Sequence, residues 1–397
     1  MAPPLIQSLQ LNGFLSFEPG SETIDLRPLN VLIGPNGSGK SNLIESFELL
    51  RATPADLASF IRQGGGASEF LWKGPDGSGP SCLSAVVSDV TNAGPLRYRI
   101  EFTESAQRLE LIDEAVEETK PRYQGKPDVY FYYRFQRGQP VINMRQPGKT
   151  GPIQRNLRRE DLDPQQSVLS QRRDPDLYPE VTGVAQVFSR IAIFREWSFG
   201  RHVPLRQPQP TDLPTDVLLP DLRNLGLVLN DLEHSDRWKR LTDLLRRFLP
   251  RFSHLSTRIQ AGHVQIYLHE DGLRAPIPAT RLSDGTIRFI ALLAVLVRPE
   301  TASLICIEEP ELGLHPDAVQ QLASLLVDAS KTTQLVVTTH SDVLVSALTE
   351  TPESVLVAEQ LGNATHLIRL EAEKLRFWLD KYTLGEIWRI GQLGGNP

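Results

Sequence analysis

The chain has 397 residues, of which 40% are hydrophobic, 23% charged and 7% aromatic, a composition typical of a soluble globular protein. This composition excludes collagen, low-complexity disorder and a disulfide scaffold, and the length allows two or three domains. Lys and Arg number 42 against 48 for Asp and Glu, so the net charge of −6 does not by itself indicate nucleic-acid binding.

The cellular location is predicted from the cysteines and from the N-terminal sequence. Two cysteines, Cys82 and Cys306, are too few for a disulfide framework and favour a reducing compartment. The N-terminal segment MAPPLIQSLQ lacks the basic and apolar regions of a signal peptide. No run approaches the roughly 18 apolar residues that a membrane span requires. We therefore expect a cytoplasmic protein that neither spans nor enters a membrane.

The first sixty residues alternate apolar runs with turns, and we predict strands over 6–17, 23–26 and 29–33. The third strand runs into a glycine-rich segment, and apolar residues at helical spacing follow it. Between about 55 and 250, glycine turn clusters and the alternating segments LRYRIEF and VYFYYRF predict an antiparallel meander. This part of the chain has the pattern of an inserted lobe.

The second half of the chain returns to alternating helices and strands. After a Pro- and Arg-rich loop over 199–224, residues 236–249 predict an amphipathic helix. The later predicted elements are an apolar helix from about 287, a strand over 303–307, a helix over 317–329 and a strand over 334–339. Such alternation predicts a parallel sheet surrounded by helices. We expect 1–55 and 255–397 to form one α/β domain around an inserted α+β lobe over 56–254.

Residues 34–41, Gly-Pro-Asn-Gly-Ser-Gly-Lys-Ser, fit the pattern of a phosphate-binding loop. Backbone N–H groups and the helix N-terminus would surround phosphates, Lys40 would reach the β and γ phosphates, and Ser41 would ligate Mg²⁺. The strand before and the helix after favour this interpretation over a simple glycine turn. The expected nucleotide contacts are Asn36, Gly37, Ser38, Gly39, Lys40, Ser41 and Asn42.

Two carboxylates and a histidine follow the later apolar strands. Glu308 and Glu309 come directly after the strand SLICI, at the end where α/β sheets place their chemistry. The first acid can hold Mg²⁺ and the second can orient an attacking water, although solvated surface charge is the alternative. His340 follows the next strand and can bond the γ-phosphate or the water; its alternative is to cap the turn before Ser341.

The segment Leu282-Ser283-Asp284-Gly285-Thr286 precedes the apolar helix. Ser283 and the free N–H groups of the helix start can bind an anion. The alternative is that Ser283 only caps a buried helix. The order of the motifs favours the anion site, because this helix ends just before the strand that carries the two carboxylates.

Together these four motifs resemble those of the ATP-binding-cassette (ABC) ATPases, in particular the SMC, RecF and OLD-like branch of AAA-family predicted ATPases. GPNGSGKSN is similar to the Walker A motif, LSDGT to the signature loop, ICIEEPELGLHP to Walker B with the D-loop, and TTHSD to the switch histidine. The resemblance covers about 1–55 and 255–397. It implies a P-loop ABC-type ATPase head, a mixed sheet flanked by helices plus N-terminal antiparallel strands, with an inserted α+β lobe.

The resemblance also implies a mechanism with ATP and Mg²⁺, in which two ATPs are sandwiched between head-to-tail protomers of a nucleotide-driven homodimer. The roles it implies are phosphate and Mg²⁺ binding for Lys40 and Ser41, metal binding for Glu308, water activation for Glu309, γ-phosphate sensing for His340, contact with the partner's ATP for Ser283 and Gly285, and the D-loop for Leu312 to His315. Two positions depart from the family pattern, Glu308 in place of Asp and Asp284 in place of Gly. Both departures leave nucleotide binding intact and bear on the rate of hydrolysis.

Two further features of the resemblance are less well defined. The glutamine that senses Mg²⁺ in such cassettes is assigned to Gln171, with Gln165 and Gln166 as alternatives. The C-terminal stretch YTLGEIWRIGQLGGNP resembles the tails of predicted ATPases in this branch, without an assigned role.

For the cellular function, we expect a free-standing cassette. It lacks the long heptad coiled coils of SMC proteins, and the 57 residues after His340 are too few for the nuclease domain of OLD-type proteins. The first hypothesis is an ATPase that acts on DNA or a DNA-bound partner in repair or anti-phage defence.

A basic window over 134–173 supports this hypothesis, although a solvated loop is its alternative. The basic residues of the window are Arg134, Arg137, Arg145, Lys149, Arg155, Arg158, Arg159, Arg172 and Arg173.

The second hypothesis is a slow ATP-dependent switch that recruits or restrains an effector protein, a nuclease or toxin, without touching DNA. A transport subunit is a distant third and would need a membrane-spanning partner.

Overall fold

The structure is a computed structural model. It describes residues 5–75, 79–88, 90–91, 94–122, 128–136, 139–144, 153–157, 162–195 and 197–394. The chain divides into two compact units. The N-terminal unit consists of Pro3–Ile191 and Leu356–Arg369, and the C-terminal unit contains Ala192–Val355 and Leu370–Pro397.

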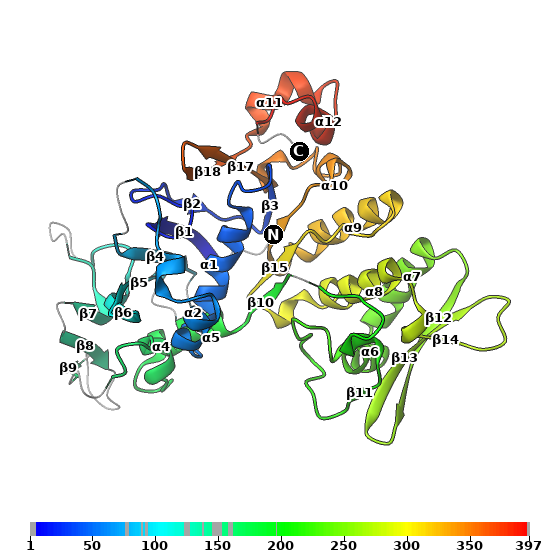
Figure 1. Cartoon of the computed structure of the whole chain (residues 1–397), viewed down its shortest axis with the longest axis horizontal. Helices are drawn as coiled ribbons and strands as arrows, with labels where there is room; N and C mark the ends of the chain where they lie inside the picture. The colour runs from blue at the N-terminus through cyan, green and yellow to red at the C-terminus, as the bar shows by residue number, and fades with distance from the viewer. Residues whose placement is uncertain are drawn as a thin grey trace. The chain divides into compact units, whose positions relative to one another are not determined.

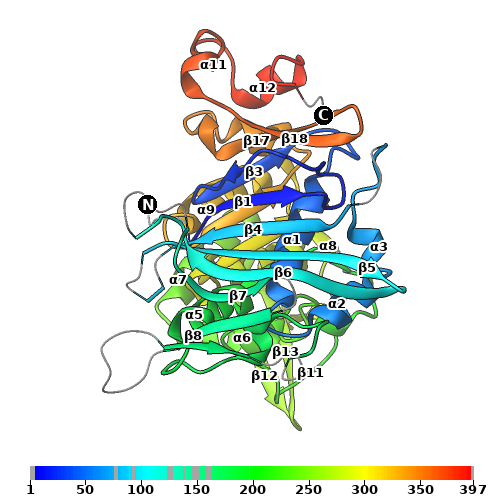
Figure 2. The same cartoon turned by 90° about the vertical axis from the view of Figure 1, so that its left-hand side faces the viewer.

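The N-terminal unit contains an eight-stranded antiparallel sheet in the order β2-β1-β4-β5-β6-β7-β8-β9. Figure 2 shows β1, β4, β5, β6, β7 and β8 side by side. The strands are β1 (Ile6–Asn12), β2 (Ile24–Asp25), β4 (Ser81–Val87), β5 (Leu96–Ser105), β6 (Arg108–Glu118), β7 (Phe131–Gln136), β8 (Gln139–Met144) and β9 (Ile153–Asn156). Buried and half-buried residues alternate along β4, so one face of this sheet packs on the core. The predicted antiparallel meander is confirmed.

The same unit carries the strand that leads into the glycine-rich loop. This strand, β3 (Leu29–Ile33), is buried at all five positions and lies beside β17 (Val355–Leu361). β17 in turn pairs antiparallel with β18 (Ala364–Arg369). The helices of this unit are α1 (Lys40–Ala52), α2 (Leu57–Gln63), α3 (Ala67–Phe70), α4 (Val168–Gln171) and α5 (Pro179–Ser189). Leu43, Ile44 and Phe47 of α1 are fully buried, as their helical spacing predicts.

In the C-terminal unit, β15 (Leu304–Glu308) and β16 (Gln334–Thr338) pair in parallel, and β10 (Ile191–Phe194) lies beside β15. Every residue of β16 is buried, as expected for a parallel strand covered on both faces. The helices α8 (Asp284–Leu296) and α9 (Pro316–Ala329) follow the predicted positions. Because α8 is buried from Phe289 to Leu296, it is a core helix and not an amphipathic surface helix.

A small sheet precedes α8 in the C-terminal unit. Its order is β11-β13-β12, with β14 paired to β13. The elements of this region are α6 (Leu225–Glu233), α7 (Arg237–Phe248), β11 (Gln209–Pro210), β12 (Phe252–Gln260), β13 (His263–Glu270) and β14 (Ile277–Pro278). The amphipathic helix predicted over 236–249 is confirmed as α7, with Leu241 and Leu245 buried.

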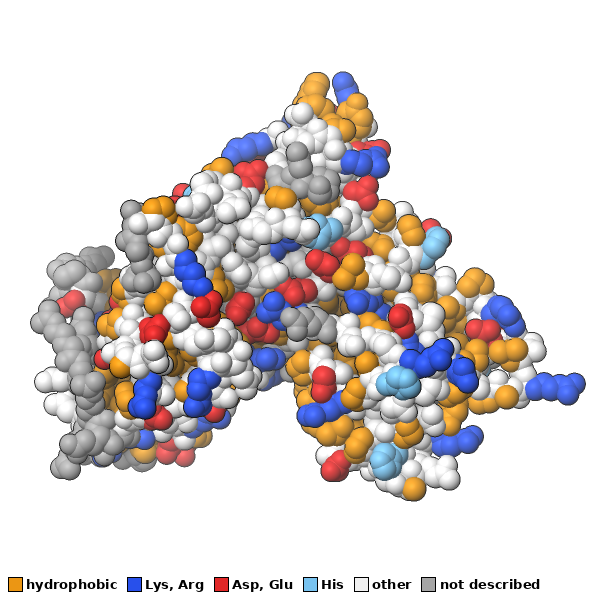
Figure 3. All heavy atoms as spheres, in the orientation of Figure 1, with side chains coloured by type: hydrophobic (Ala, Val, Ile, Leu, Met, Phe, Trp, Pro, Cys, Tyr) orange, Lys and Arg blue, Asp and Glu red, His pale blue; other side chains and the backbone are white. Residues whose placement is uncertain are grey.

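Three helices complete this unit, and they are α10 (Asp342–Ser346), α11 (Ala372–Leu379) and α12 (Leu384–Arg389). Figure 1 shows α12 beside α10. Apolar side chains lie at the surface over α11 and α12 (Figure 3), and Phe377 is 67% exposed there. Among the described residues, no helix is long and apolar enough to cross a membrane.

The predicted inserted lobe, 56–254, contributes to both units, because its residues up to Ile191 belong to the N-terminal unit and those from Ala192 to the C-terminal unit. The domain boundaries 1–55, 56–254 and 255–397 therefore stay a prediction. The structure groups the chain by which strands and helices pack together, and the sequence pattern cannot reveal that grouping.

Candidate functional site

The glycine-rich loop of the N-terminal unit joins β3 to α1. Gly37 and Gly39 have φ angles of 79° and 92°, in the left-handed region that glycine adopts without strain. Gly39 also permits a close approach, because an added Cβ there would overlap the hydroxyl of Thr365. The glycines thus allow a loop geometry that other residues at these positions would block.

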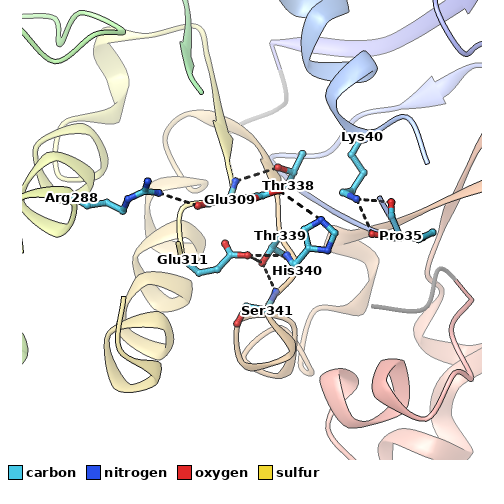
Figure 4. A network of polar contacts seen from close by, with 10 residues as sticks. Pro35, Lys40, Arg288, Glu309, Glu311, Thr338, Thr339, His340 and Ser341 are labelled. Carbon is cyan, nitrogen blue, oxygen red and sulfur yellow. Dashed lines mark hydrogen bonds and ion pairs between the residues drawn. The ribbon is translucent and has the colours of Figure 1, made fainter. Parts of the chain in front are cut away.

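Lys40 is the first residue of α1 and folds back over the loop. Its ammonium donates to the carbonyl oxygens of Gly34 and Pro35 at 2.7 and 2.9 Å, and Figure 4 shows it turned toward Pro35. Only 7% of Lys40 is exposed, so its charge is held within the loop. Among the described residues no side chain caps the N-terminus of α1, and the positive end of the helix dipole at this position favours anions.

The hydroxyl groups of Thr365 and Ser16 and the amide of Asn42 form hydrogen bonds beside the loop. The Thr365 hydroxyl on β18 donates to the Ser38 carbonyl at 3.0 Å and lies 2.7 Å from Ser16 Oγ. Asn42 donates to the same Ser16 oxygen at 2.7 Å. Ser38 Oγ is buried and has no hydrogen-bond partner in the described part of the chain, whereas Ser41 is exposed. A strand from the other end of the chain therefore fixes the phosphate loop.

The two carboxylates predicted after β15 have different environments in the C-terminal unit. Glu308 ends the strand, and its Oε2 accepts from Arg195 Nε at 3.1 Å. The other oxygen of Glu308 is buried without a hydrogen-bond partner among the described residues. An oxygen of this kind fits a hard cation such as Mg²⁺, which binds carboxylate and hydroxyl oxygens. The metal role predicted for Glu308 agrees with this donor chemistry and stays a prediction.

Glu309 has an unusual backbone conformation. Its φ of 43° lies in the left-handed region, which is strained for a residue other than glycine. The strain is offset because Glu309 N donates to the carbonyl of Thr338 at 3.0 Å and approaches its hydroxyl at 3.2 Å. Arg288 donates to the Glu309 carbonyl at 3.3 Å, and Figure 4 shows these contacts. Thr338 and Arg288 therefore hold the backbone of Glu309 in this conformation.

His340 lies close to Glu309. The distance from His340 Nε2 to Glu309 Oε1 is 3.7 Å, and each side chain is about one third exposed (31% and 37%). Glu311 accepts the His340 amide at 2.8 Å and the Thr339 hydroxyl at 2.6 Å. The structure thus brings together the residues predicted for water activation and phosphate sensing, and adds Glu311 as the group that holds the histidine backbone.

The signature segment begins α8. Ser283 is the N-cap of α8, and its hydroxyl accepts a hydrogen bond from Thr286 N at 3.1 Å. Ser283 therefore caps the helix, which was the alternative to an anion site. The carboxylate of Asp284 pairs with Arg206, whose guanidinium is almost fully buried (3% exposed) and also donates to backbone carbonyls, among them that of Leu282. A Cβ on Gly285 would lie 2.6 Å from the carbonyl oxygen of Gly313 in the D-loop, so the two motifs are in close contact.

Gln171 has a local role in the structure. Its amide oxygen accepts from Asp163 N at 2.7 Å, and its nitrogen donates to the Gln166 carbonyl at 2.8 Å. Gln166 bonds Asp56 at 2.7 Å, and Gln165 donates its backbone N–H to Asp163. The assignment of Gln171 as the Mg²⁺-sensing glutamine stays a prediction, without support from these contacts.

The basic window is described only in part. Arg137, Arg145, Lys149, Arg158 and Arg159 lie outside the described residues. Among the described members, Arg134 pairs with Glu117 at 3.0 Å, and Arg172 donates to the carbonyl of Gln171 at 3.0 Å. No cluster of three or more His, Cys, Asp or Glu side chains that could hold a metal is found within the described ranges.

The family of the chain follows from comparison with known proteins. A family model described as "AAA domain, putative AbiEii toxin, Type IV TA system" matches residues 29–346. The chain belongs to this family. The match of this AAA-domain protein runs from β3, through the phosphate loop and the two carboxylates, to α10. No curated protein sequence matches it significantly.

Solved structures with the same fold are heads of SMC proteins. A crystal structure of an Smc head bound to the C-winged helix domain of ScpA is 15% identical, with a TM-score of 0.61 over 94% of this chain and 99% of that one. The Smc head with an extended coiled coil from Pyrococcus furiosus, bound to the C-terminal domain of ScpA, is 12% identical, with a TM-score of 0.56 over 95% and 99%. The AAA-domain protein therefore has the mixed α/β fold of a P-loop, ABC-type ATPase head, and the predicted fold class and family are confirmed.

Proposed function

We propose that this AAA-domain protein binds ATP with Mg²⁺ and hydrolyses it as a nucleotide-gated, head-to-tail homodimer. The pairing of Glu309 with His340, 3.7 Å apart, is the observation that carries the proposal. A carboxylate accepts the proton of an attacking water, and an adjacent imidazole bonds the γ-phosphate or the same water. The backbone of Glu309 is strained and is hydrogen-bonded at both its N–H and its carbonyl. This favours a fixed catalytic position over the role of a solvated surface charge.

The phosphate loop supplies the binding half of the proposal. No side chain in the described part of the chain caps the N-terminus of α1, a position that favours anions, and the ammonium of Lys40 lies within the loop, where it would offset the charge of the β and γ phosphates. The donors proposed for Mg²⁺ are the Ser41 hydroxyl and the carboxylate of Glu308, one oxygen of which has no hydrogen-bond partner among the described residues. The metal, when bound, neutralises phosphate charge that develops in the transition state.

The signature segment supports the dimer. Ser283, Gly285 and the D-loop over 312–315 would contact the ATP of a second copy. The departure at Asp284 does not place an uncompensated charge there, because its carboxylate is paired with Arg206. At the second departing position, the carboxylate of Glu308 is likewise paired with a guanidinium, that of Arg195. The two departures are thus compatible with binding of a polyphosphate.

A test of this proposal combines three variants with Mg²⁺-ATP turnover and size-exclusion chromatography. Lys40→Ala should lose nucleotide binding or turnover. Glu309→Gln should bind ATP, stop hydrolysis and accumulate a dimer, whereas the matched control Glu373→Gln, on the exposed surface of α11, should behave as wild type. Ser283→Arg should cripple turnover and spare binding.

Each variant also has an outcome that contradicts its assignment. Normal turnover of Lys40→Ala would remove the phosphate-loop role. A Glu309→Gln protein that stays monomeric with ATP would remove the sandwich dimer, and full activity of Ser283→Arg would mean that the signature segment is not used between copies.

For the cellular role, we propose first an ATPase in DNA repair or anti-phage defence. The resemblance to SMC and RecF proteins and the basic window over 134–173 support this role. Binding of DNA by the Glu309→Gln protein that requires ATP and weakens with salt would be the expected result.

The second candidate is a regulatory switch that captures an effector protein, a nuclease or toxin. It is supported by the pairing of Arg134 with Glu117, which reduces the charge available to DNA, and by the likeness to an Smc head bound to another protein. Indifference of the dimer to DNA would favour this candidate over the first.

A further inference from the structure

The C-terminal segment with the sequence YTLGEIWRI forms a docked helix and not a loose tail. Thr383 and Glu386 form a capping box at the start of α12, in which each side chain bonds the other's backbone N–H. On the inner side of the helix, Leu384, Ile387 and Trp388 are completely buried. A helix of six residues is too short to be stable alone, so packing must hold it in place.

The helix against which α12 packs is α10. Gly385 makes the approach close, because an added Cβ would overlap the carbonyl oxygen of Asp342 and the hydroxyl of Ser346. Leu384 N donates to Thr349 Oγ1 at 3.0 Å, just after α10. Since both ends of α10 are in contact with α12, a larger residue at position 385 would displace α10.

The first turn of α10 comes directly after the switch histidine. Ser341 caps the helix, accepting from Leu344 N at 3.2 Å, and Asp342 is the first helical residue. Arg389 at the end of α12 lies 3.4 Å from the Asp342 carboxylate. With Glu311 holding the amide of His340 from the other side, the direction of the imidazole depends on where α10 begins.

We propose that α12 is a positioning element for hydrolysis, which fixes α10 and thereby holds His340 beside Glu309. The inference rests on the proposed function and assigns a role to the C-terminal motif. The contacts of α12 described above are with α10 and Thr349, so its effect on hydrolysis acts through the position of His340. It should therefore change the rate of hydrolysis and leave ATP affinity nearly unchanged.

The experiment uses the full chain and measures ATP turnover and the Kd for ATP separately. Gly385→Ala should lower kcat at least about tenfold, since misplacement of a catalytic group by 1 Å can cost on the order of 100-fold, with Kd within about twofold of wild type. Gly79→Ala is the matched control, because its added Cβ has open space and its backbone is not left-handed. It should leave both quantities unchanged.

A double-mutant cycle separates positioning from general loss of structure. In a His340→Ala background, Gly385→Ala should lower turnover by less than about twofold further, since the group that it misplaces is gone. If Gly385→Ala fails to fold by circular dichroism, Thr349→Val replaces it. This change keeps the side-chain volume and removes the hydroxyl that accepts from Leu384 N and donates to the carbonyl of Ser346 in α10. It should lower kcat severalfold, again only when His340 is present.

Two results overturn the inference while leaving the proposed function intact: wild-type kcat in folded Gly385→Ala or Thr349→Val, or equal losses with and without His340. Wild-type turnover in His340→Ala alone would instead contradict the role proposed for the histidine. The two failures are therefore distinguishable in one set of assays.

Discussion

The phosphate loop is held by a residue that no motif marks, and substitution of Thr365 tests how far this contact prepares the loop for ATP. Thr365 is 4% exposed, and its hydroxyl bridges the Ser38 carbonyl and Ser16 Oγ. In Thr365→Val the volume is kept and the hydroxyl is lost. The Ser38 carbonyl then loses a donor in a buried place, whereas the half-buried Ser16 oxygen loses one contact and keeps the hydrogen bond from Asn42.

The expected magnitude follows from these two contacts. A lost hydrogen bond costs about 1 kcal/mol net, and a buried group left unpaired costs about 1–3 kcal/mol. If about 2 kcal/mol of this cost falls on the conformation that binds ATP, affinity drops roughly 30-fold. Thr365→Ser keeps the hydroxyl and should bind ATP within about threefold of wild type, because it loses only a methyl group.

The assay is isothermal titration of each variant with ATP and Mg²⁺, together with thermal unfolding to show that the fold is intact. A Thr365→Val protein that is folded and binds ATP as tightly as wild type would refute the reasoning. So would a Thr365→Ser protein as weak as Thr365→Val, since the hydroxyl would then not be the group that matters.

Two further predictions concern stability. Arg206→Met should lower the free energy of unfolding, measured in urea, by more than about 2 kcal/mol, because several buried carbonyls lose their donor. Asp284→Asn should lower it by less than about 1 kcal/mol, since the carboxyl of Asp284 is 73% exposed. Equal losses in the two variants would contradict this prediction. Burial raises the pKa of Glu114 to about 7, from an ordinary 4.5, against the opposing hydrogen bonds from Ser167, Val168 N and Tyr98. The folded state thus binds this proton more tightly, so its contribution to stability is full below about pH 4.5 and is lost as the pH rises through 7. Glu114→Gln should remove a pH dependence of about 3 kcal/mol between pH 4.5 and 8, measured by urea unfolding, and an unchanged profile would count against it.

The parts of the fold that could be predicted from sequence are those with strong periodicity. The buried strand before the phosphate loop and the strand that ends at Glu308 are mostly apolar, so their positions were predictable within about two residues. The amphipathic pattern likewise located α7. The division into units was not predictable, because it depends on which distant elements pack together.

The candidate site shows the same limit. Lys40, Glu309 and His340 are marked by glycine spacing or by strand ends, and the resemblance supplied their roles. Glu311 stands in the same ICIEEPE run and could have been found as a third acid beside a strand end. Thr365 could not have been found, because it acts from 349 positions after Ser16 and a lone threonine carries no signal.

The two departures from the family pattern share a structural explanation that neither motif contains. Glu308 pairs with Arg195, and Asp284 pairs with Arg206, so the carboxylate at each departing position is paired with an arginine. Both arginines follow β10: Arg195 comes directly after the strand, and Arg206 lies in the Pro- and Arg-rich loop predicted over 199–224. A connecting segment has no periodic pattern, so the sequence does not reveal which side chains its arginines contact. Those contacts become known only when the positions of the strands and helices are known. Because Arg206 balances the carboxylate that Asp284 adds to the signature segment, substitution of Arg206 should affect hydrolysis more strongly than Asp284→Asn, which removes the charge that Arg206 balances.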